Sequence, residues 1–434
     1  MTNTSQLSFI LSTLFSTRVL SFAQFCTLID NRDAVLSNDA PNEPTTVRSL
    51  CMQEAASIAK RIYGNKIYVR GLIEFTNFCK NNCRYCGIRA ANTNAHRYRL
   101  TKEEIFSCCD SGYELGFRTF VLQGGEDPYF TDDMIADIVR SIKANHSDCA
   151  VTLSVGEKER DTYKLWKEAG ADRYLLRHET ASDAHYRMLH PDTLSPEHRK
   201  QCLWNLKELG YQTGAGFMVG SPYQTTQHLA QDLLFLHDLD PQMIGIGPFI
   251  HHDQTPFANM KDGTCEETLF LLSVLRIMFP NVLLPATTAL GTIQQDGREQ
   301  GILCGANVIM PNLSPVLHRK DYALYNNKIC TGEEAAECVN CLKRRVQSIG
   351  YEVVTDRGDY KSVNFSWGYK EGSHEHGRHT AFITAPHRHF RAHQQRQVIA
   401  AERTHQPAVC SGKRRRRYHH RPRLQDNGDS RHRA

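Results

Sequence analysis

The 434-residue chain lacks a long hydrophobic run. Its apolar start, residues 7–25, is interrupted by Ser, Thr, Gln and Arg18, and no uninterrupted apolar stretch approaches the ~20 residues that span a membrane. A secretory signal is also missing, so we expect a cytoplasmic protein whose 15 Cys are reduced. Because no acidic residue precedes Asp30, an organelle transit peptide remains an alternative for the first segment.

Acidic residues are scarce in the last part of the chain. Residues 363–434 contain 13 Arg and 2 Lys against 3 Glu and 2 Asp, which gives this segment a charge of +10. Because the whole chain has a net charge of +5, residues 1–362 have a net charge of −5. The same segment holds 10 of the 21 His and the run from Lys413 to Arg417, with little apolar periodicity. Such a composition cannot bury a core. It predicts a disordered tail over residues 363–434.

The body of the chain repeats one unit: a short apolar run, a polar loop and an amphipathic helical stretch. The apolar runs, eight in all, are 67–75, 119–122, 150–154, 173–177, 213–219, 243–250, 282–287 and 306–310. The helical stretches between them include 101–115, 131–143, 158–169, 196–209, 225–239 and 265–278. Strands that alternate with helices favour a parallel sheet. Eight such units predict an α/β fold, a (β/α)8 barrel over residues 67–329.

The two flanking segments have different expected roles. Residues 1–66 are expected to form helices outside the barrel. Residues 330–362 follow the last strand and contain three Cys.

Polar residues gather where the predicted strands end. The sequence Gln123-Gly-Gly-Glu-Asp127 follows the second strand, Ser154 ends the third, Arg177-His-Glu179 ends the fourth, and Thr287-Thr288 ends the seventh. In a (β/α)8 barrel the active site lies at the carboxyl ends of the strands. Their joint position therefore predicts one site at the mouth of the barrel.

Three cysteines follow the first predicted strand with the spacing C-x3-C-x2-C. They are Cys79, Cys83 and Cys86. A cubane [4Fe-4S] cluster is normally held by four Cys, so a loop with three leaves one iron with an open position for a substrate or cofactor. A zinc site or a disulfide pair is the alternative, although zinc sites usually show C-x2-C pairs with a second pair downstream.

The cysteine loop resembles that of the radical S-adenosylmethionine (SAM) superfamily. Tyr85 occupies the aromatic position before the third Cys, and Gly124-Gly125-Glu126 is similar to the motif by which that superfamily holds the amino group of SAM. The resemblance implies a [4Fe-4S] cluster whose open iron binds SAM, and a reaction that yields a 5′-deoxyadenosyl radical. Asp127, Ser154, Glu179 and Arg199 are the further expected cofactor contacts; a guanidinium can hold the SAM carboxylate with two hydrogen bonds.

Several longer runs resemble the biotin synthase-like group, and within it the HydE family of [FeFe]-hydrogenase maturases. The runs start at Ile73, Tyr174, Thr213, Gly245, Pro285 and Cys304, and the resemblance extends over about residues 20–360. It implies a small organometallic or amino-acid-like substrate, an iron carbonyl cyanide cysteine precursor processed during H-cluster assembly. It also implies other hydrogenase maturases as partners and an electron donor such as flavodoxin or ferredoxin.

The family resemblance implies an anionic substrate inside the barrel. The implied residues are Arg173, Arg177, Thr287, Thr288, Met310 and Tyr322. Two Arg and two hydroxyls at one mouth suit a carboxylate, and Tyr322 can donate or transfer a proton. Met310 has a second interpretation, as core packing of the eighth strand.

The remaining cysteines divide into two groups. Cys330, Cys338 and Cys341, with the spacing C-x7-C-x2-C, match an auxiliary iron-sulfur site of some maturases, [2Fe-2S] or [4Fe-4S]; unoccupied thiols are the alternative. We expect the others in strand and helix patterns to be small buried hydrophobic residues: Cys108, Cys109, Cys149, Cys202 and Cys304. His251-His252 is interpreted as a loop feature.

Two other functions compete with this interpretation. Another biotin synthase-like enzyme, such as a methylornithine synthase, would act on an amino acid and would need the same Arg pair. The basic tail could instead indicate a nucleic-acid-binding protein, since such runs bind phosphates through charge. The acidic body and the lack of an RNA-binding module argue against nucleic acid.

Overall fold

The computed structural model describes residues 4–37, 44–332 and 339–362. All of them belong to a first compact unit, residues 1–364. The predicted disordered tail lies outside the described residues. In the part of the chain that is described, no helix is long and apolar enough to cross a membrane.

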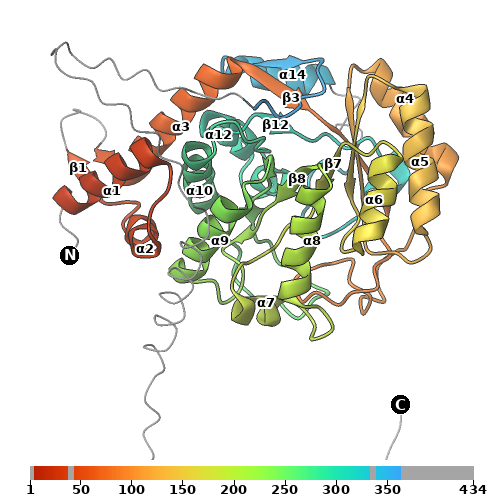
Figure 1. The fold of residues 1–434 in the computed structure, drawn as a ribbon, viewed down its shortest axis with the longest axis horizontal. Coiled ribbons are helices and arrows are strands. Elements are labelled where there is room, and N and C mark those ends of the chain that lie inside the picture. Colours follow the sequence, from red (N-terminus) through yellow and green to blue (C-terminus); the bar gives the residue numbers. More distant parts are fainter. Residues whose placement is uncertain (1–3, 38–43, 333–338, 363–434) are drawn as a thin grey trace, which may run out of the picture. The chain divides into compact units, whose positions relative to one another are not determined.

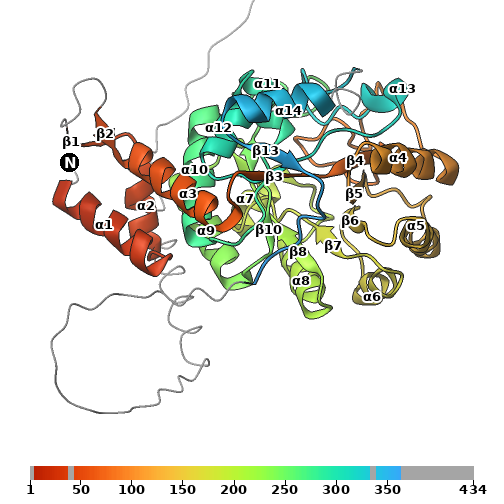
Figure 2. The same ribbon diagram turned by 90° about the horizontal axis from the view of Figure 1, so that it is seen from above.

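The N-terminal helices lie outside the barrel, next to α9 and α10 (Figures 1 and 2). They are α1 (Thr4–Thr17), α2 (Phe22–Asp30) and α3 (Val47–Tyr63), with a short antiparallel pair of strands, β1 (Val35–Ser37) and β2 (Thr45–Thr46), before α3. Capping boxes start two of these helices, at Ser21 and at Thr46. The apolar face of α1 is buried, including Leu7 and Leu14, which explains the apolar start of the sequence.

A parallel sheet forms most of the barrel wall. Its order is β10-β8-β7-β6-β5-β4. The strands are β4 (Gly71–Thr76), β5 (Thr119–Gly124), β6 (Ala150–Ser154), β7 (Arg173–Leu175), β8 (Gln212–Ala215) and β10 (Met243–Ile244). All five neighbouring pairs are parallel. The predicted strand order along the chain is therefore confirmed.

The barrel closes through shorter pairings. β12 (Val308–Ile309) pairs with β3 (Lys66–Val69), which continues into β4 after Arg70. The predicted seventh strand is reduced to two bridges, from Leu283 to Met243 and from Pro285 to Val308. At the mouth, β9 (Met218–Val219) pairs with β11 (Gly247–Pro248), so the predicted strands 213–219 and 243–250 are each split in two.

The predicted helices agree with the structure to within two residues at each end. They are α4 (Lys102–Glu114), α5 (Asp132–Asn145), α6 (Arg160–Glu168), α8 (Pro196–Glu208), α9 (Thr226–Leu239) and α10 (Cys265–Met278). Most start with a Ser or Thr whose side chain accepts a backbone hydrogen bond, as at Thr101 and Ser195. The sequence patterns did not indicate α7 (Asp183–Leu189), α11 (Thr288–Ile293), α12 (Gly297–Leu303) or α13 (Val316–Arg319).

Residues after the auxiliary cysteines complete the base of the barrel. Following α14 (Val339–Ser348), β13 (Glu352–Val354) pairs in parallel with β3, and Figure 2 shows the two strands side by side. Gly358 has φ +58 and lies against Tyr68, where a Cβ would be only 2.7 Å from the ring. The next residue, Asp359, reaches the first residues of β7 and β8.

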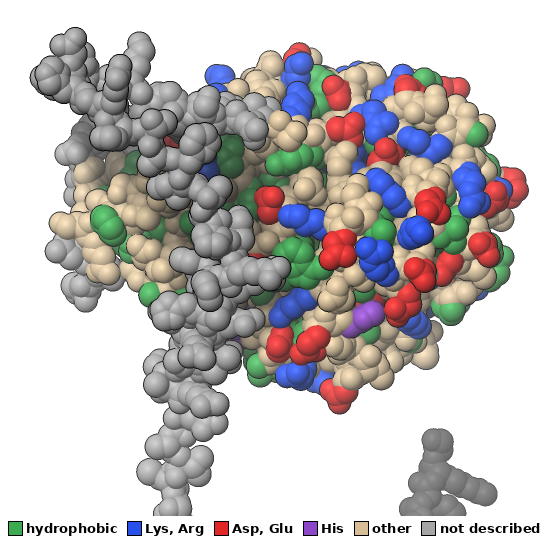
Figure 3. Space-filling view, viewed as in Figure 1, with side chains coloured by type: hydrophobic (Ala, Val, Ile, Leu, Met, Phe, Trp, Pro, Cys, Tyr) green, Lys and Arg blue, Asp and Glu red, His purple; other side chains and the backbone are tan. Residues whose placement is uncertain are grey.

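The outer helices carry mixed charge. Figure 3 shows Lys or Arg alternating with Asp or Glu over the face that includes α5, α6 and α8. Pairs such as Lys158–Asp132, at 3.0 Å, lie on this surface. Exposed ion pairs of this kind contribute about 0–1 kcal/mol each. This face of the described residues has no large surface of one sign.

Candidate active site

One cavity of about 340 Å³ opens at the carboxyl ends of the strands. It lies within the volume range of small-molecule sites. Most of the residues that the sequence singled out line it: Cys79, Cys83, Tyr85, Cys86, Gly124, Gly125, Glu126, Ser154, Arg177, Glu179, Arg199, Thr287, Thr288 and Tyr322. Asn81, Gln123 and Tyr325 line it too, and none of the three is among the ligands predicted from the sequence.

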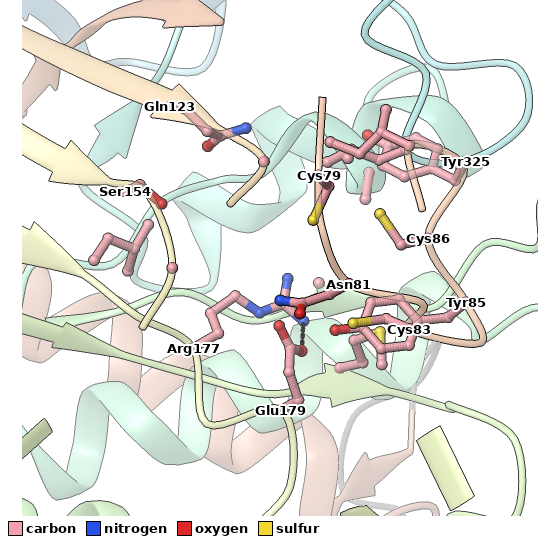
Figure 4. A pocket seen from close by; sticks show the side chains of 18 of the residues that line it. Cys79, Asn81, Cys83, Tyr85, Cys86, Gln123, Ser154, Arg177, Glu179 and Tyr325 are labelled. Atoms are coloured by element: carbon pink, nitrogen blue, oxygen red, sulfur yellow. Dashed lines mark hydrogen bonds and ion pairs between the residues drawn. The ribbon is translucent and has the colours of Figure 1, made fainter. Parts of the chain in front are cut away.

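The three cysteines of the loop after β4 share one side of the cavity. Figure 4 shows Cys79, Cys83 and Cys86 on this side, across from Ser154 and Gln123. All three are free thiols, so the disulfide alternative does not apply to them. Among the described residues no three His, Cys, Asp or Glu side chains form a ready site for a single metal ion.

Burial raises the pKa of each thiol, and nearby anionic groups add to this: Glu126 for Cys79, and other cysteines for Cys83 and Cys86. For Cys83 burial is the larger cause and Cys86 the next, and for Cys86 burial together with Cys79 raises the pKa to about 12. Iron must replace these protons when it binds. Three free thiols on one wall of a cavity fit an iron-sulfur cluster, which binds thiolates.

Two glycines let the second strand's loop approach the cysteine loop. A Cβ on Gly125 would lie 2.1 Å from the carbonyl oxygen of Phe78 and 2.7 Å from Cβ of Cys79. Gly156, with φ +84, leaves room for the Glu126 carboxylate, which would otherwise meet a Cβ at 2.1–2.4 Å. The Glu126 carboxylate accepts a hydrogen bond from the Glu157 N–H at 3.1 Å. Its position at the cavity wall is thus set by backbone geometry.

Arg199 is held by a buried acid. The Nε of Arg199 lies 2.6 Å from Oε1 of Glu157, and both side chains are largely buried. Burial alone would lower the pKa of Arg199, but Tyr186 and Glu157 together raise it above its usual value. Arg199 is therefore a permanent cation at the cavity, and Glu157 is a functional candidate that the sequence did not reveal.

Tyr85 is packed against a neutral histidine. Its hydroxyl lies 3.2 Å from Nε2 of His190. Burial, and then Arg199, lower the pKa of His190 to about 3, so this imidazole is uncharged. The Tyr85 ring meets the His190 ring edge-on at 5.5 Å between centroids. This contact fixes the aromatic ring at the wall of the cavity.

Arg177 and Glu179 face the same space from the end of β7. Figure 4 shows their side chains paired, and Nη2 of Arg177 lies 2.8 Å from Oε2 of Glu179. The Nε of Arg177 is buried without a hydrogen-bond partner in the described residues, as is Oγ1 of Thr287. Unpaired buried donors of this kind indicate that a polar ligand completes the site.

Tyr322 keeps its proton. Burial, and then Glu74, raise its pKa far above the usual value. The Nε2 of Gln123 donates to its hydroxyl oxygen at 3.4 Å, which leaves the hydroxyl proton available to another acceptor. The Tyr322 main chain is held by Lys328, whose Nζ also lies 2.6 Å from Oε1 of the buried Glu74.

Three predicted site residues do not line the cavity: Asp127, Arg173 and Met310. Asp127 points away from the cavity and accepts two hydrogen bonds from Arg99, at 2.7 and 2.9 Å, and one from Thr76. Arg173 is the first residue of β7, so it is fully buried at the opposite end of the barrel, where it binds Asp359. The prediction that Asp127 contacts the cofactor and Arg173 the substrate does not agree with these positions.

Met310 lies in a smaller, separate chamber inside the barrel. The chamber measures about 20 Å³ and is also lined by Arg70, Thr152 and Met243. Met310 packs against the cluster that contains Met243 and Leu283, which favours the core-packing interpretation. Arg70 is fully buried there; its Nη1 contacts the sulfur of Met243 at 3.0 Å, and its Nε and Nη2 have no partner in the described residues.

The auxiliary cysteines are only partly described. Cys330 is a free, half-buried thiol whose sulfur accepts from Nη1 of Arg298 at 3.8 Å. Cys341 takes part in a disulfide bond, and Cys338 lies outside the described residues. The described residues therefore do not bring three free thiols together at this site. The five cysteines expected to be small core residues are all buried.

Comparison with known proteins agrees with this geometry. The radical SAM superfamily model matches residues 73–236. The [FeFe] hydrogenase maturase subunit HydE of Thermotoga maritima is 50% identical over 309 residues, which cover 71% of this chain and 88% of that protein. The chain belongs to the HydE family of [FeFe] hydrogenase maturases. It is therefore a radical SAM enzyme, and a [4Fe-4S] cluster and SAM are its family cofactors.

More distant relatives share the fold of this HydE family member. The 3-methylornithine synthase of Methanosarcina acetivorans is 28% identical over 69% of this chain and 83% of that protein. The crystal structure of methylornithine synthase (PylB) has a TM-score of 0.66 at 24% identity and covers 80% of this chain and 97% of its own. That of HydG, a maturase of the [FeFe]-hydrogenase, has a TM-score of 0.67 at 20% identity and covers 82% and 77%. These likenesses confirm the predicted barrel.

Proposed function

We propose that this chain acts in the assembly of the [FeFe]-hydrogenase active site as a radical SAM enzyme that processes an iron carbonyl cyanide cysteine precursor. The observation that carries the proposal is the set of three free, half-buried thiols on one wall of a cavity that also holds unpaired hydrogen-bond donors. The 50% identity to a HydE maturase supports this type of reaction.

The residues around the cavity can hold both family cofactors. Cys79, Cys83 and Cys86 would hold the cluster, and Glu126, Ser154, Glu179, Arg199 and Tyr85 would hold SAM. Bound together, the cluster and SAM supply a 5′-deoxyadenosyl radical. Arg199, fixed by Glu157 at 2.6 Å, would bind the SAM carboxylate, because a guanidinium matches a carboxylate in shape and charge. The Gly124–Gly125 backbone and the Glu126 carboxylate would face the ammonium.

The substrate would bind on the other side of the cavity. Arg177, Thr287 and Thr288 offer a cation and two hydroxyls, and the unpaired Nε of Arg177 and Oγ1 of Thr287 would gain partners from an anionic ligand. A charge-assisted hydrogen bond is worth about 1.5–3 kcal/mol. Tyr322 would donate a hydrogen bond to the bound molecule, since burial raises its pKa and keeps the hydroxyl protonated.

The remaining partners follow from the same proposal. An electron donor such as flavodoxin or ferredoxin would reduce the cluster, other hydrogenase maturases would supply the substrate or accept the product, and the chain would work in the cytoplasm. Residues 77–101, around the cluster loop, contain five Lys or Arg and no Asp or Glu. Arg84 is exposed, and Lys80 has 59% of its side chain exposed. An acidic redox protein would be attracted to this surface.

An auxiliary cluster is part of the proposal. Cys330, Cys338 and Cys341 would bind a [2Fe-2S] or [4Fe-4S] cluster once all three are reduced. The support is their spacing in the sequence and the free thiol of Cys330 beside the cation of Arg298.

The test uses anaerobically reconstituted full-length protein. We expect dithionite to give the electron paramagnetic resonance (EPR) signal of a [4Fe-4S]+ cluster and SAM to be cleaved to 5′-deoxyadenosine. Cys83→Ala should lose both the signal and the cleavage, whereas Cys108→Ala, a buried cysteine on α4, should keep both. SAM cleavage by Cys83→Ala would overturn the assignment of the cysteine triplet.

A methylornithine synthase-like reaction is the second candidate. It is favoured by the 28% identical relative and by Arg177, which would bind the carboxylate of any amino acid. The two functions are separated by the substrate that increases 5′-deoxyadenosine release. We expect an increase with a cysteine-ligated iron carbonyl cyanide complex. An increase with an unmodified amino acid alone would favour the second candidate.

A further inference from the structure

A buried acid lies on the apolar face of helix α9. Asp232 is fully buried, between Leu229 and Leu236, where the helical pattern calls for an apolar residue. Burying a carboxylate is costly unless it has partners. The presence of Asp232 on this face therefore needs a structural or functional reason. Asp232 is not among the residues that line the cavity.

Asp232 has two partners, both next to the end of β7. Its Oδ1 accepts a hydrogen bond from the backbone N–H of Ala181 at 2.5 Å and lies 3.3 Å from Nε2 of His178, which is also fully buried. This second contact is a close charge-to-ring contact and not a directed hydrogen bond, because Nε2 of His178 has no hydrogen-bond partner in the described residues. The Nδ1 of His178 accepts from the backbone N–H of Gly216 at 3.3 Å. Because a backbone N–H can only donate, Nδ1 is the acceptor, and the imidazole proton is on Nε2, the nitrogen that faces Asp232.

The residue between these two anchors has an unusual backbone. Glu179 has φ +65, a region that residues with a side chain rarely adopt. The N–H of Thr180 donates to the carbonyl oxygen of His178 at 2.8 Å, which closes a three-residue turn around Glu179. A γ-turn with a positive central φ is rare and strained. Strained backbone of this kind persists only where the surrounding contacts impose it.

The surrounding contacts do impose it at Glu179. His178 is fixed before the turn, and Ala181 is fixed after it by Asp232, while the N–H of Glu179 donates to Gly216 at 3.0 Å. The His178 ring is enclosed by Phe235, at 4.8 Å between centroids, and by Phe217 at 5.9 Å. The anchors form a rigid support behind the turn, and the Glu179 carboxylate projects from its front into the cavity (Figure 4).

We propose that the His178–Asp232 pair is a positioning device that holds Glu179 in the strained turn and so aims its carboxylate at SAM. Asp232 touches neither the cavity nor a cofactor, so it acts only through Glu179 and its neighbours. The inference rests on the proposed function, in which Glu179 contacts SAM. It adds that SAM affinity depends on a residue of α9 behind the cavity wall.

Asp232→Asn is the first test. The amide oxygen of Asn can still accept from Ala181, but the charge that faces His178 is lost. Asp238→Asn is the matched control, because Asp238 is an exposed carboxylate on the same helix. We expect Asp232→Asn to keep its iron content and its EPR signal without SAM, to weaken SAM binding at least fivefold, and to alter the EPR change that SAM causes. Asp238→Asn should bind SAM as the wild type does.

A double-mutant cycle separates positioning from general damage. If Asp232 acts through Glu179, adding Asp232→Asn to Glu179→Ala should weaken SAM binding less than twofold further. An equal fivefold loss in both backgrounds, or wild-type binding by the single variant Asp232→Asn, would overturn the proposal. The proposed function fails separately, since it requires SAM cleavage by the wild-type protein.

A rescue variant covers the case in which Asp232→Asn does not fold. In His178→Gln the side-chain oxygen can accept from Gly216 and the side-chain nitrogen can donate to Asp232. We expect His178→Gln to bind SAM within twofold of the wild type and His178→Leu to bind at least fivefold more weakly. If His178→Gln is fully loaded and stable but loses affinity fivefold, the pair does not act through its contacts with Gly216 and Asp232 and the proposal is wrong.

Discussion

Arg173 and Asp359 form an ion pair across the base of the barrel, with 2.6 Å between Nη2 and Oδ1. The same guanidinium donates to Oγ1 of Thr119 at 2.9 Å and to the carbonyl oxygen of Arg357 at 2.8 Å. Arg173 thereby ties the first residues of β5 and β7 to the segment that follows β13. Arg177 lies only four residues further along the chain, just after β7, but it lines the cavity at the opposite end of the barrel.

This separation predicts opposite effects for one substitution at two positions. Lys lacks the planar fork of Arg and cannot keep several directed hydrogen bonds. Arg173→Lys should lower the free energy of unfolding by about 1–3 kcal/mol, the usual cost of unsatisfied buried groups, and leave substrate binding unchanged. Arg177→Lys should weaken substrate binding about tenfold or more and leave cluster content and stability unchanged. Thermal unfolding and substrate titration of both variants provide the measurement, and a substrate-binding loss in Arg173→Lys alone would contradict the assignment.

The sequence was sufficient for the elements with strong local signals. Thr101, Thr131 and Thr225 cap helices where the patterns predicted helix starts, and the eight apolar runs all lie on the barrel wall. The cysteine triplet and the glycines before Glu126 were recognisable because their spacing depends on adjacent residues only. Features that depend on residues close together in the chain can therefore be predicted from a single sequence.

Contacts between distant residues could not be predicted in this way. Arg173 and Arg177 are both Arg on one predicted strand, and nothing local says that one lies at the base and the other at the mouth. Asp127 follows Glu126 directly, but Arg99 and Thr76 hold it on the other side of the loop. Glu157 gave no signal, because its importance lies in its contact with Arg199. An acid on the apolar face of α9, Asp232, is an anomaly that the helical pattern alone could have revealed.

A buried ion pair behind Tyr322 yields a stability prediction. Lys328 and Glu74 are both buried, and Glu74 has Asn312 as a further donor at 2.8 Å. Removing one partner of such a pair typically costs about 3–5 kcal/mol, because the other charge stays buried without compensation. Lys328→Met should therefore be strongly destabilised. The double variant Lys328→Met with Glu74→Gln should recover most of the loss, and denaturant unfolding of the three proteins tests this. A double variant no more stable than Lys328→Met would show that the charge is not the cause.

The auxiliary site gives a prediction for cluster content. Cys330→Ser should lower the total iron of reconstituted protein and leave SAM cleavage largely intact, because Cys330 is not among the residues that line the cavity. Cys304→Ser, a buried cysteine outside both sets, is the control for iron content. Iron analysis and 5′-deoxyadenosine release measure the two effects. A loss of cleavage as large as that of Cys83→Ala would make the site part of catalysis.

The basic surface of the cluster loop predicts how reduction depends on charge. Arg84→Glu should slow reduction of the cluster by an acidic flavodoxin or ferredoxin about tenfold at low salt, since it replaces attraction by repulsion. The difference from the wild type should shrink as salt is added, because salt screens exposed charges. Dithionite, a small reductant, should reduce both proteins alike. Equal rates with the redox protein at low salt would place the docking surface elsewhere.

Two truncations test where the functional chain ends. A protein that stops after Ser362 keeps β13, Arg357 and Asp359, so we expect the stability, iron content and SAM cleavage of the full-length chain. The segment it lacks carries +10 and little apolar sequence, and removing it should also remove adventitious metal bound by its ten His. A protein that stops after Tyr351 loses the base contacts to Arg173 and Gln212 and should be destabilised or insoluble. Limited proteolysis of the full-length protein should cut first beyond residue 362. Loss of SAM cleavage in the protein that ends at Ser362, or protection of residues 363–434 from protease, would show that these residues contribute to the enzyme.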